Sequence, residues 1–249
     1  MSYSYDAASN RKTMTDPEGG GTHYNYDTLN RLSSLSDFQA NNFTFQYDNL
    51  SRRTQLTRPN GVNTNYSYDN LSHLLSVLHQ LNSTTLDGAS YTYDNAGNRL
   101  TKTDQRAAVT SNYGYDAVYQ LLQATQGATT TESYTYDVVG NRLSSLGVSP
   151  YAYNSSNQLT STPSATYTYD HNGNTKTKVI SGSTTTYNWD YENRLTSVVL
   201  PGSGGTVSFK YDALGRRVQK SSTSGTTNYL YDVMNVIEEV DNGGNALAR

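Results

Sequence analysis

The sequence lacks cysteine altogether, and its 249 residues include only four histidines and five prolines. Without cysteine the chain forms neither disulfide bonds nor thiolate metal sites, although this absence indicates no particular cellular compartment. The longest aliphatic run is Val198-Val199-Leu200, whereas a membrane-spanning helix needs about 20 apolar residues. We therefore expect no membrane insertion. Met1 leads directly into the repeated pattern described below, with no signal peptide.

Charge is scarce as well. Charged residues make up 16% of the chain, and the formal net charge is -3. Because the basic residues are scattered, the sequence does not favour nucleic acid as a partner. The four histidines show no ligand or triad spacing, and no Gly-x-Ser-x-Gly or phosphate-loop motif occurs. These absences predict a protein that is not an enzyme and that binds no metal or cofactor.

Aromatic residues are plentiful. Hydrophobic residues amount to only 34% of the chain, but it contains 23 tyrosines. Disordered chains are poor in aromatics and usually strongly charged, so disorder is not expected. The aromatic side chains must then supply most of the core.

A short motif, aromatic-x-aromatic-Asp, recurs along the whole chain at intervals of about 20 residues. It occurs 12 times, and its last position is Asp in every copy except one, where Asn154 replaces it. A period in this range is typical of repeat proteins, in which each unit packs only against its neighbours. We therefore predict that residues 1–249 form a single repeat array. The second aromatics of the 12 copies are Tyr5, Tyr26, Tyr47, Tyr68, Tyr93, Tyr115, Tyr136, Tyr153, Tyr169, Trp189, Tyr211 and Tyr231.

Each copy has the pattern of a β-hairpin. The two aromatics stand two residues apart, so on a strand both rings project from the same face. A turn containing Gly or Asn follows the Asp, and a second strand and a Ser/Thr/Gly-rich connector complete the copy. The predicted fold is all-β, a continuous antiparallel ribbon of hairpins. One segment, 71–81, also has leucines at helical spacing, and a helix there is the less favoured alternative.

Packing within the ribbon is predicted from the same pattern. Stacked copies would place tyrosine beside tyrosine across strands. Their hydroxyls would find partners among polar connector residues. The basic residue that follows each turn, such as Arg99, would pair with the turn Asp or stack on tyrosine. The shortened copies around Tyr151 and Tyr167 predict a bend in the ribbon.

Segments 91–100 and 134–143 both read Tyr-x-Tyr-Asp-x-x-Gly-Asn-Arg-Leu. This pattern resembles the YD repeat of bacterial Rhs (rearrangement hotspot) proteins, which also builds the shells of toxin-complex C components and of animal teneurins. The resemblance covers nearly the whole chain. It implies a ribbon that spirals into a hollow shell with tyrosine-rich walls, and in family members that shell encloses a toxin or effector carried at the C-terminus.

The self-cleavage motif of that family, Asp-Pro-x-Gly-Leu, has no counterpart here. The only Asp-Pro, in Asp16-Pro17-Glu18-Gly19-Gly20, lacks the Leu and fits an ordinary connector. The resemblance therefore implies no catalytic residue. The chain has the extent expected of a repeat block without its core and toxin segments.

Most candidate site residues are explained as parts of the repeat. Asp170 to Asn174 has the spacing of a calcium loop, but Ser181 stands where the twelfth-position acid is required. Three aromatics are candidate sugar-binding platforms, namely Tyr119, Trp189 and Tyr191, although burial against a turn is the commoner role of large aromatics. The residues predicted to have structural roles in the repeat are Tyr91, Tyr93, Asp94, Gly97, Asn98, Arg99, Tyr134, Tyr136, Asp137, Gly140, Asn141 and Arg142.

The sequence is compatible with three functions. The first is a non-catalytic block of an Rhs-type shell that encapsulates or displays a C-terminal toxin, located outside the cell or at its surface, with a flanking core and toxin segment as partner. The second is a module that binds cell-surface carbohydrate. The third is a fibre or scaffold that self-associates through open strand edges.

Overall fold

The computed structural model describes residues 1–248, all of which lie in β-strands, turns or loops. The predicted all-β class is confirmed. The chain divides into two compact units, Met1–Ser133 and the residues from Tyr134 onward.

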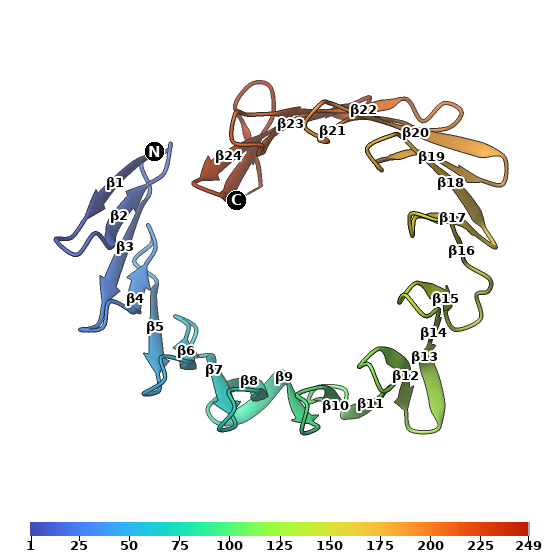
Figure 1. Cartoon of the computed structure of the whole chain (residues 1–249). Helices are drawn as coiled ribbons and strands as arrows, with labels where there is room; N and C mark the ends of the chain where they lie inside the picture. The colour runs from blue at the N-terminus through green and yellow to red at the C-terminus, as the bar shows by residue number, and fades with distance from the viewer. Residues whose placement is uncertain (249) are drawn as a thin grey trace. The chain divides into compact units, whose positions relative to one another are not determined.

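The first unit is a single antiparallel sheet in which 13 strands follow one another in chain order (Figure 1). Each strand from β2 to β12 therefore pairs with the strands that precede and follow it in the sequence, and β1 and β13 are the edges. The strands are β1 Ser2–Tyr5, β2 Arg11–Thr15, β3 Gly21–Tyr26, β4 Leu32–Ser36, β5 Asn42–Tyr47, β6 Arg53–Thr57, β7 Asn63–Tyr68, β8 Leu74–Leu81, β9 Thr84–Tyr93, β10 Arg99–Asp104, β11 Val109–Tyr115, β12 Leu121–Gln126 and β13 Thr129–Ser133.

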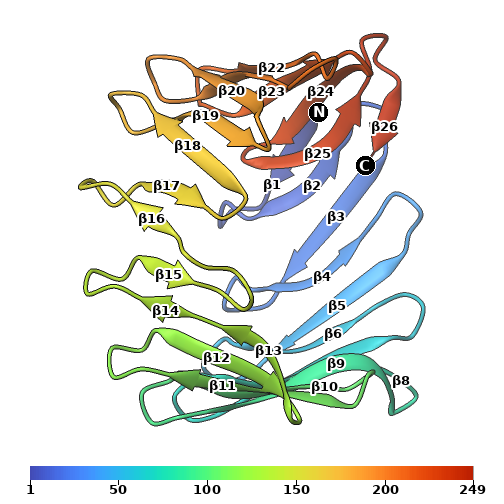
Figure 2. The ribbon, with the colours of Figure 1, turned by 90° about the vertical axis from the view of Figure 1, so that its right-hand side faces the viewer.

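The second unit contains a two-stranded sheet followed by an 11-stranded sheet, again in chain order (Figure 2). The ladder is interrupted between Ser144 and Ala152, beside the two shortest repeat spacings. Its strands are β14 Thr135–Tyr136, β15 Arg142–Ser144, β16 Ala152–Tyr153, β17 Leu159–Thr162, β18 Ala165–Tyr169, β19 Thr175–Ile180, β20 Ser183–Trp189, β21 Leu195–Val199, β22 Thr206–Tyr211, β23 Arg217–Ser222, β24 Gly225–Asp232, β25 Asn235–Val240 and β26 Ala246–Ala248.

One turn geometry closes 11 of the 12 hairpins. The N–H of the third residue after the Asp donates to the Asp carbonyl, and the Asp N–H donates to the carbonyl of the fourth residue. The third residue adopts positive φ, as in Gly97 at 88° and Asn30 at 58°, which explains the preference for Gly, Asn and Ser there. In every hairpin the register also leaves one residue of the second strand without a facing residue, as Leu100 between Arg99 and Thr101, and this residue forms a bulge. The exception in turn geometry is the twelfth copy, where Asp232 pairs directly with Asn235.

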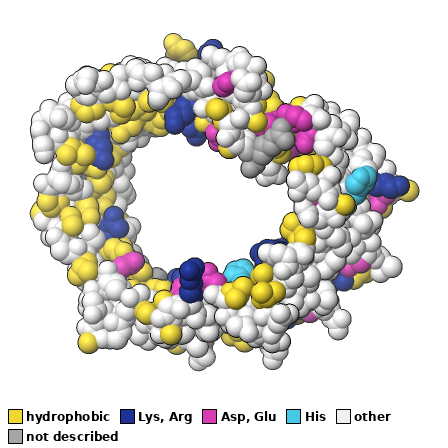
Figure 3. All heavy atoms as spheres, turned by 180° about the vertical axis from the view of Figure 1, so that it is seen from behind, with side chains coloured by type: hydrophobic (Ala, Val, Ile, Leu, Met, Phe, Trp, Pro, Cys, Tyr) yellow, Lys and Arg dark blue, Asp and Glu magenta, His cyan; other side chains and the backbone are white. Residues whose placement is uncertain are grey.

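The two faces of the ribbon differ in chemistry. The residue between the two aromatics points to one face, where it bonds across the hairpin, as Ser67 Oγ does with Ser76 Oγ at 2.6 Å and Thr168 with Thr177 at 2.6 Å. The aromatics point to the other face. Figure 3 shows hydrophobic side chains gathered in a band along one face of the second unit.

The segment that allowed a helical interpretation is a strand. Leu74–Leu81 forms β8, which pairs with β7 on one side and β9 on the other. The exposed Leu71 belongs to the preceding turn. The helical spacing of these leucines is incidental, because pairing on both sides determines the backbone conformation.

Conventional core packing is nearly absent, contrary to the expectation that aromatics would build a core. Among the described residues the buried hydrophobic side chains are Ala89, Ala124 and Ala165. The ribbon is a single layer, so the rings of its aromatic face are half-buried by neighbouring strands and not enclosed between two layers. Among residues 1–248, no second sheet or helix covers that face within either unit.

Candidate functional site

The contact that joins successive hairpins is made by the second aromatic of the motif. Tyr68 on β7 donates its hydroxyl hydrogen to the backbone carbonyl of Arg53, at the start of β6, with an oxygen–oxygen distance of 3.0 Å. The acceptor is always the fifth residue after the Asp of the preceding hairpin. The same contact is made by Tyr47, Tyr68, Tyr93, Tyr115, Tyr153, Tyr169, Trp189, Tyr211 and Tyr231.

This observation corrects the expectation that polar connector residues would satisfy the tyrosine hydroxyls. The fifth residue after the Asp faces the second aromatic of its own hairpin in the strand register, as Arg53 faces Tyr47. Trp189 occupies the same position with a different side chain, and its Nε1–H donates to the carbonyl of Thr175 at 2.8 Å. The position therefore requires a large aromatic with a hydrogen-bond donor at its far end. Burial beside the neighbouring strand raises the pKa of Tyr68, Tyr93 and Tyr115 above the ordinary value.

The carboxylate of the motif closes its own turn. Asp94 accepts the N–H of Ala96 at 2.9 Å and that of Asn98 at 2.8 Å with one oxygen, and the Asn98 side-chain amide at 2.9 Å with the other. The Asn98 amide is the main cause that lowers the pKa of Asp94, and backbone donors lower it further against the effect of desolvation. Asp170 is bonded in the same way to Asn172 and Asn174.

In other hairpins arginine replaces that asparagine and reaches farther. Arg52 donates its Nε–H to Asp48 at 2.7 Å. Its Nη1 donates to the carbonyl of Asp69 in the next hairpin at 2.9 Å, and its guanidinium carbon lies 4.7 Å from the ring centre of Tyr68. Both predicted roles of arginine, pairing with the turn Asp and stacking on tyrosine, occur in one side chain.

A second set of arginines stands one residue later and separates the first aromatics of neighbouring hairpins. The guanidinium carbon of Arg99 lies 5.8 Å from the ring centre of Tyr91 and 4.7 Å from that of Tyr113. Such contacts contribute about 0.5–1 kcal/mol each at exposed sites. Arg142 lies in the same way between Tyr134 and Tyr151.

The expected tyrosine-on-tyrosine ladder across strands is wrong. In the strand register Tyr24 faces Leu35, and Tyr66 faces Val77. The reason is geometric: successive first strands are two strands apart, about 9.6 Å, with the second strand of a hairpin between them. Within the described residues, the ring pairs that lie close are Tyr134 with Tyr136 and His73 with Tyr93.

The three predicted sugar-binding aromatics lie in different local surroundings. Trp189 is packed in the repeat position described above. Tyr191 lies at a turn tip with its side chain fully exposed, at 104% of the reference area. Tyr119 belongs to the other unit, where it is 63% exposed and holds the positive-φ position of its turn, at 67°.

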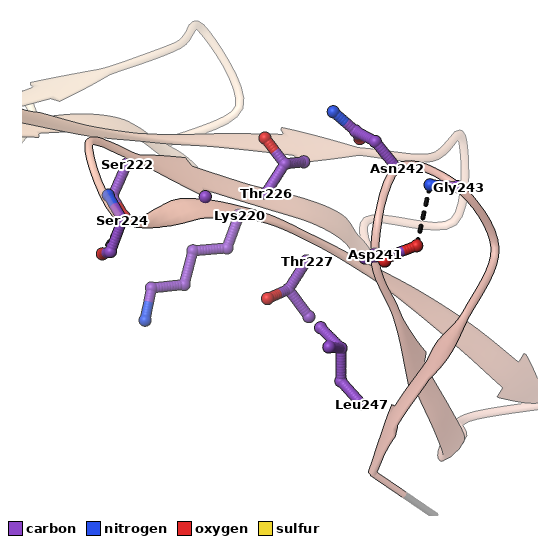
Figure 4. A pocket seen from close by; sticks show the side chains of 10 residues that line it. Lys220, Ser222, Ser224, Thr226, Thr227, Asp241, Asn242, Gly243 and Leu247 are labelled. Carbon is purple, nitrogen blue, oxygen red and sulfur yellow. Dashed lines mark hydrogen bonds between the residues drawn. The ribbon is translucent and has the colours of Figure 1, made fainter.

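An open cleft of about 470 Å³ lies near the last strands of the second unit (Figure 4). Lys220, Thr227 and Leu247 line it, and the Asp241 carboxylate at its rim bonds the N–H of Gly243 at 2.7 Å. This carboxylate serves the turn at 241–245. Across residues 1–248, no group of three His, Cys, Asp or Glu side chains could hold a metal ion.

These features define a class of protein, one built from tandem β-hairpins in which an aromatic side chain bonds each hairpin to the one before. Residues 101–236, more than half of the chain, match the family described as the Teneurin YD-shell. The chain belongs to this YD-shell family. The predicted membership of the Rhs/YD-repeat group is confirmed.

Solved structures show the same fold. The chain is similar to a component of the Photorhabdus luminescens Tc holotoxin pore, with 19% identity and a TM-score of 0.72 over 97% of this chain. It is also similar to a chain in the crystal structure of TcdB2-TccC3, with 19% identity and a TM-score of 0.67 over 96% of this chain. It spans only 14% and 15% of the length of those chains. At such identities the likeness shows the fold alone.

No curated protein sequence matches the chain. In the part of the chain that the structure describes, no helix is long and apolar enough to cross a membrane.

Proposed function

We propose that this chain is a non-catalytic structural block of a YD-repeat shell that encapsulates or displays a C-terminal toxin or effector. The observation that carries the proposal is the contact from the second aromatic to the preceding hairpin, which recurs along both units. Because every such contact joins neighbours, the repeats of each unit hold together with no need for a core.

The chemistry of the two faces supports enclosure. Hydroxyl and amide pairs such as Thr92 with Thr101 line one face and suit contact with water. The other face presents aromatic rings and arginines that no second layer covers. An uncovered apolar surface of this kind is typical of an interaction surface, and a cargo would meet it inside a shell. The partner in this proposal is a flanking core and toxin segment, and the proposed location is outside the cell or at its surface, which the likeness to Tc toxin structures supports.

Electron microscopy of the purified chain tests the proposal. A hollow or C-shaped particle is the expected result. A thin, straight filament would overturn the shell assignment for this chain and would favour the self-assembling scaffold, an alternative supported by the exposure of every residue of the edge strand β1.

Binding of cell-surface carbohydrate is the second alternative, and it rests on the fully exposed ring of Tyr191. A glycan screen at millimolar sugar, run with the native chain and with Tyr191→Ala, tests it. Binding that the substitution abolishes would support a sugar site at this turn, and a blank screen with the native chain would reject it.

A further inference from the structure

Turn tips of neighbouring hairpins contact each other through two positions, which we name the tip donor and the tip acceptor. The tip donor is the fourth residue after the motif Asp. The tip acceptor is the third residue after the Asp of the following hairpin, where φ is positive. These two positions are about 20 residues apart in sequence, and in five pairs their side chains bond to each other in one of two combinations.

In three pairs both positions are asparagine. Asn10 donates its side-chain amide to the Oδ1 of Asn30 at 3.0 Å, and Asn174 donates in the same way to Asn193 at 2.8 Å. The third such pair, Asn141 with Asn157, has a distance of 3.0 Å. The two short amides span the gap between the tips together.

In two pairs the donor is arginine and the acceptor is serine. Arg31 Nη1 donates to Ser51 Oγ at 3.2 Å and to the Asp48 carbonyl at 3.1 Å. Its guanidinium carbon also lies 4.8 Å from the ring centre of Tyr47. Arg52 repeats the arrangement with Ser72 Oγ at 3.1 Å.

Glycine acceptors show why the match depends on side-chain size. A Cβ added at Gly97 would lie 3.1 Å from the His73 ring, and one added at Gly173 would lie 3.1 Å from the side-chain nitrogen of Gln158. Where the tip acceptor has no hydroxyl, the arginine donor bonds another group. The tip acceptor that follows Arg194 is Gly215, and Arg194 Nη1 instead donates to the Glu192 carboxylate at 2.6 Å.

Within the sheet of the first unit, no described residue serves as a tip donor to the turn of the edge strand β1, which presents the serine type of acceptor. Ser9 has φ of 65°, against 63° for Ser51 and 70° for Ser72. The Ser9 N–H donates to the Asp6 carbonyl at 3.1 Å, the same bond that shapes the other two turns. Tyr5 is the one second aromatic that is exposed, at 58%, and β1 is the edge of its sheet.

We propose that Tyr5, Asp6 and Ser9 form a docking surface for a further YD hairpin whose tip donor is arginine. The guanidinium of that hairpin would stack on the Tyr5 ring and donate to the Asp6 carbonyl and to Ser9 Oγ. The Tyr5 hydroxyl would donate to the carbonyl of the residue after that arginine, as Tyr47 does to Leu32. This inference goes beyond the shell function, since the same edge would select its neighbour in a shell or in a fibre.

The test extends the full chain by one hairpin. A copy of residues 21–42 placed directly before Met1 preserves the 21-residue spacing, because its Tyr26 then precedes Tyr5 by as many residues as Tyr26 precedes Tyr47. Four proteins are compared: the copied hairpin with Arg31 or with Arg31→Asn, each in front of Ser9 or Ser9→Asn. Asparagine is accommodated at positive φ, as Asn30 shows. The readout is hydrogen exchange of the β1 amides.

With Ser9 in place, the arginine hairpin is expected to slow exchange of the β1 amides about fivefold more than the asparagine hairpin. Ser9→Asn is expected to reverse this order, because it recreates the asparagine pair. Equal slowing by both hairpins in both backgrounds would overturn the selection of arginine, and no slowing by either would overturn the docking itself. These outcomes are independent of particle shape in electron microscopy, so failure of this inference is distinguishable from failure of the shell proposal.

Discussion

Replacing Tyr211 by Phe tests whether the hydroxyl contact between hairpins stabilises the ribbon. The substitution keeps the ring and removes only the donor to the Leu195 carbonyl, which lies 2.8 Å away. The contact is also well placed for detection, because Leu195 faces Trp189 in the strand register, and Trp189 is the only tryptophan of the chain.

The expected loss follows from general hydrogen-bond energetics. A neutral intramolecular hydrogen bond contributes about 0.5–1.5 kcal/mol net to the free energy of unfolding. With a urea dependence of about 1–3 kcal/mol per molar, a loss of ~1 kcal/mol lowers the urea midpoint by about 0.3–1 M. Trp189 fluorescence during urea unfolding measures that midpoint in the second unit.

The chain supplies a matched control. Tyr191→Phe removes a hydroxyl from the same unit, but this hydroxyl is fully exposed at a turn tip. Its loss should change the free energy of unfolding by less than about 0.5 kcal/mol. Equal midpoints for Tyr211→Phe and Tyr191→Phe would refute the idea that the hydroxyl contact holds neighbouring hairpins together.

Three further outcomes follow from the described residues. Gly88→Ala should destabilise the first unit by more than ~1 kcal/mol, because φ at Gly88 is 137° and the new Cβ would meet the Val77 carbonyl oxygen. Gly114→Ala is the control, since a Cβ added there would have nothing within 4 Å. Similar urea midpoints for the two variants would contradict the expected destabilisation. The lowered pKa of Asp94 and Asp137, caused first by the Asn98 and Asn141 amides, means that the stability they contribute is present above the unfolded pKa of about 3.9 and is lost as the pH falls below it. A urea midpoint that is constant from pH 7 to 5 and then decreases is expected, and one that stays constant down to pH 2.5 would argue against the turn role. Burial raises the pKa of Tyr68 and Tyr115, so the stability that these tyrosines contribute is present below about pH 10 and is lost as the pH rises through their pKa values in the folded chain. Phenolate absorbance that titrates at the ordinary tyrosine pKa in the folded chain would contradict this expectation.

Much of the fold could be predicted from local sequence signals. Two aromatics at i and i+2 with a polar residue between them predict a two-faced strand. An Asp followed three residues later by Gly, Asn or Ser predicts the tight turn, because that position requires positive φ, as at Gly97 and Asn30. The regular spacing of the copies indicates that these hairpins adjoin one another in order. These signals act within one hairpin or between consecutive hairpins, so no tertiary information is needed.

The tertiary structure alone decided which atoms meet across hairpins. The Tyr68 hydroxyl bonds a backbone carbonyl 15 residues earlier, and nothing in residue types distinguishes one carbonyl from another. In place of the expected ladder of tyrosine rings, Arg99 lies between Tyr91 and Tyr113, because the second strand of each hairpin lies between successive first strands. Tip pairs such as Arg31 with Ser51 depend on strand spacing and on the bulge after each turn. Sequence thus determined the hairpin and its order, whereas the distances between strands determined its contacts.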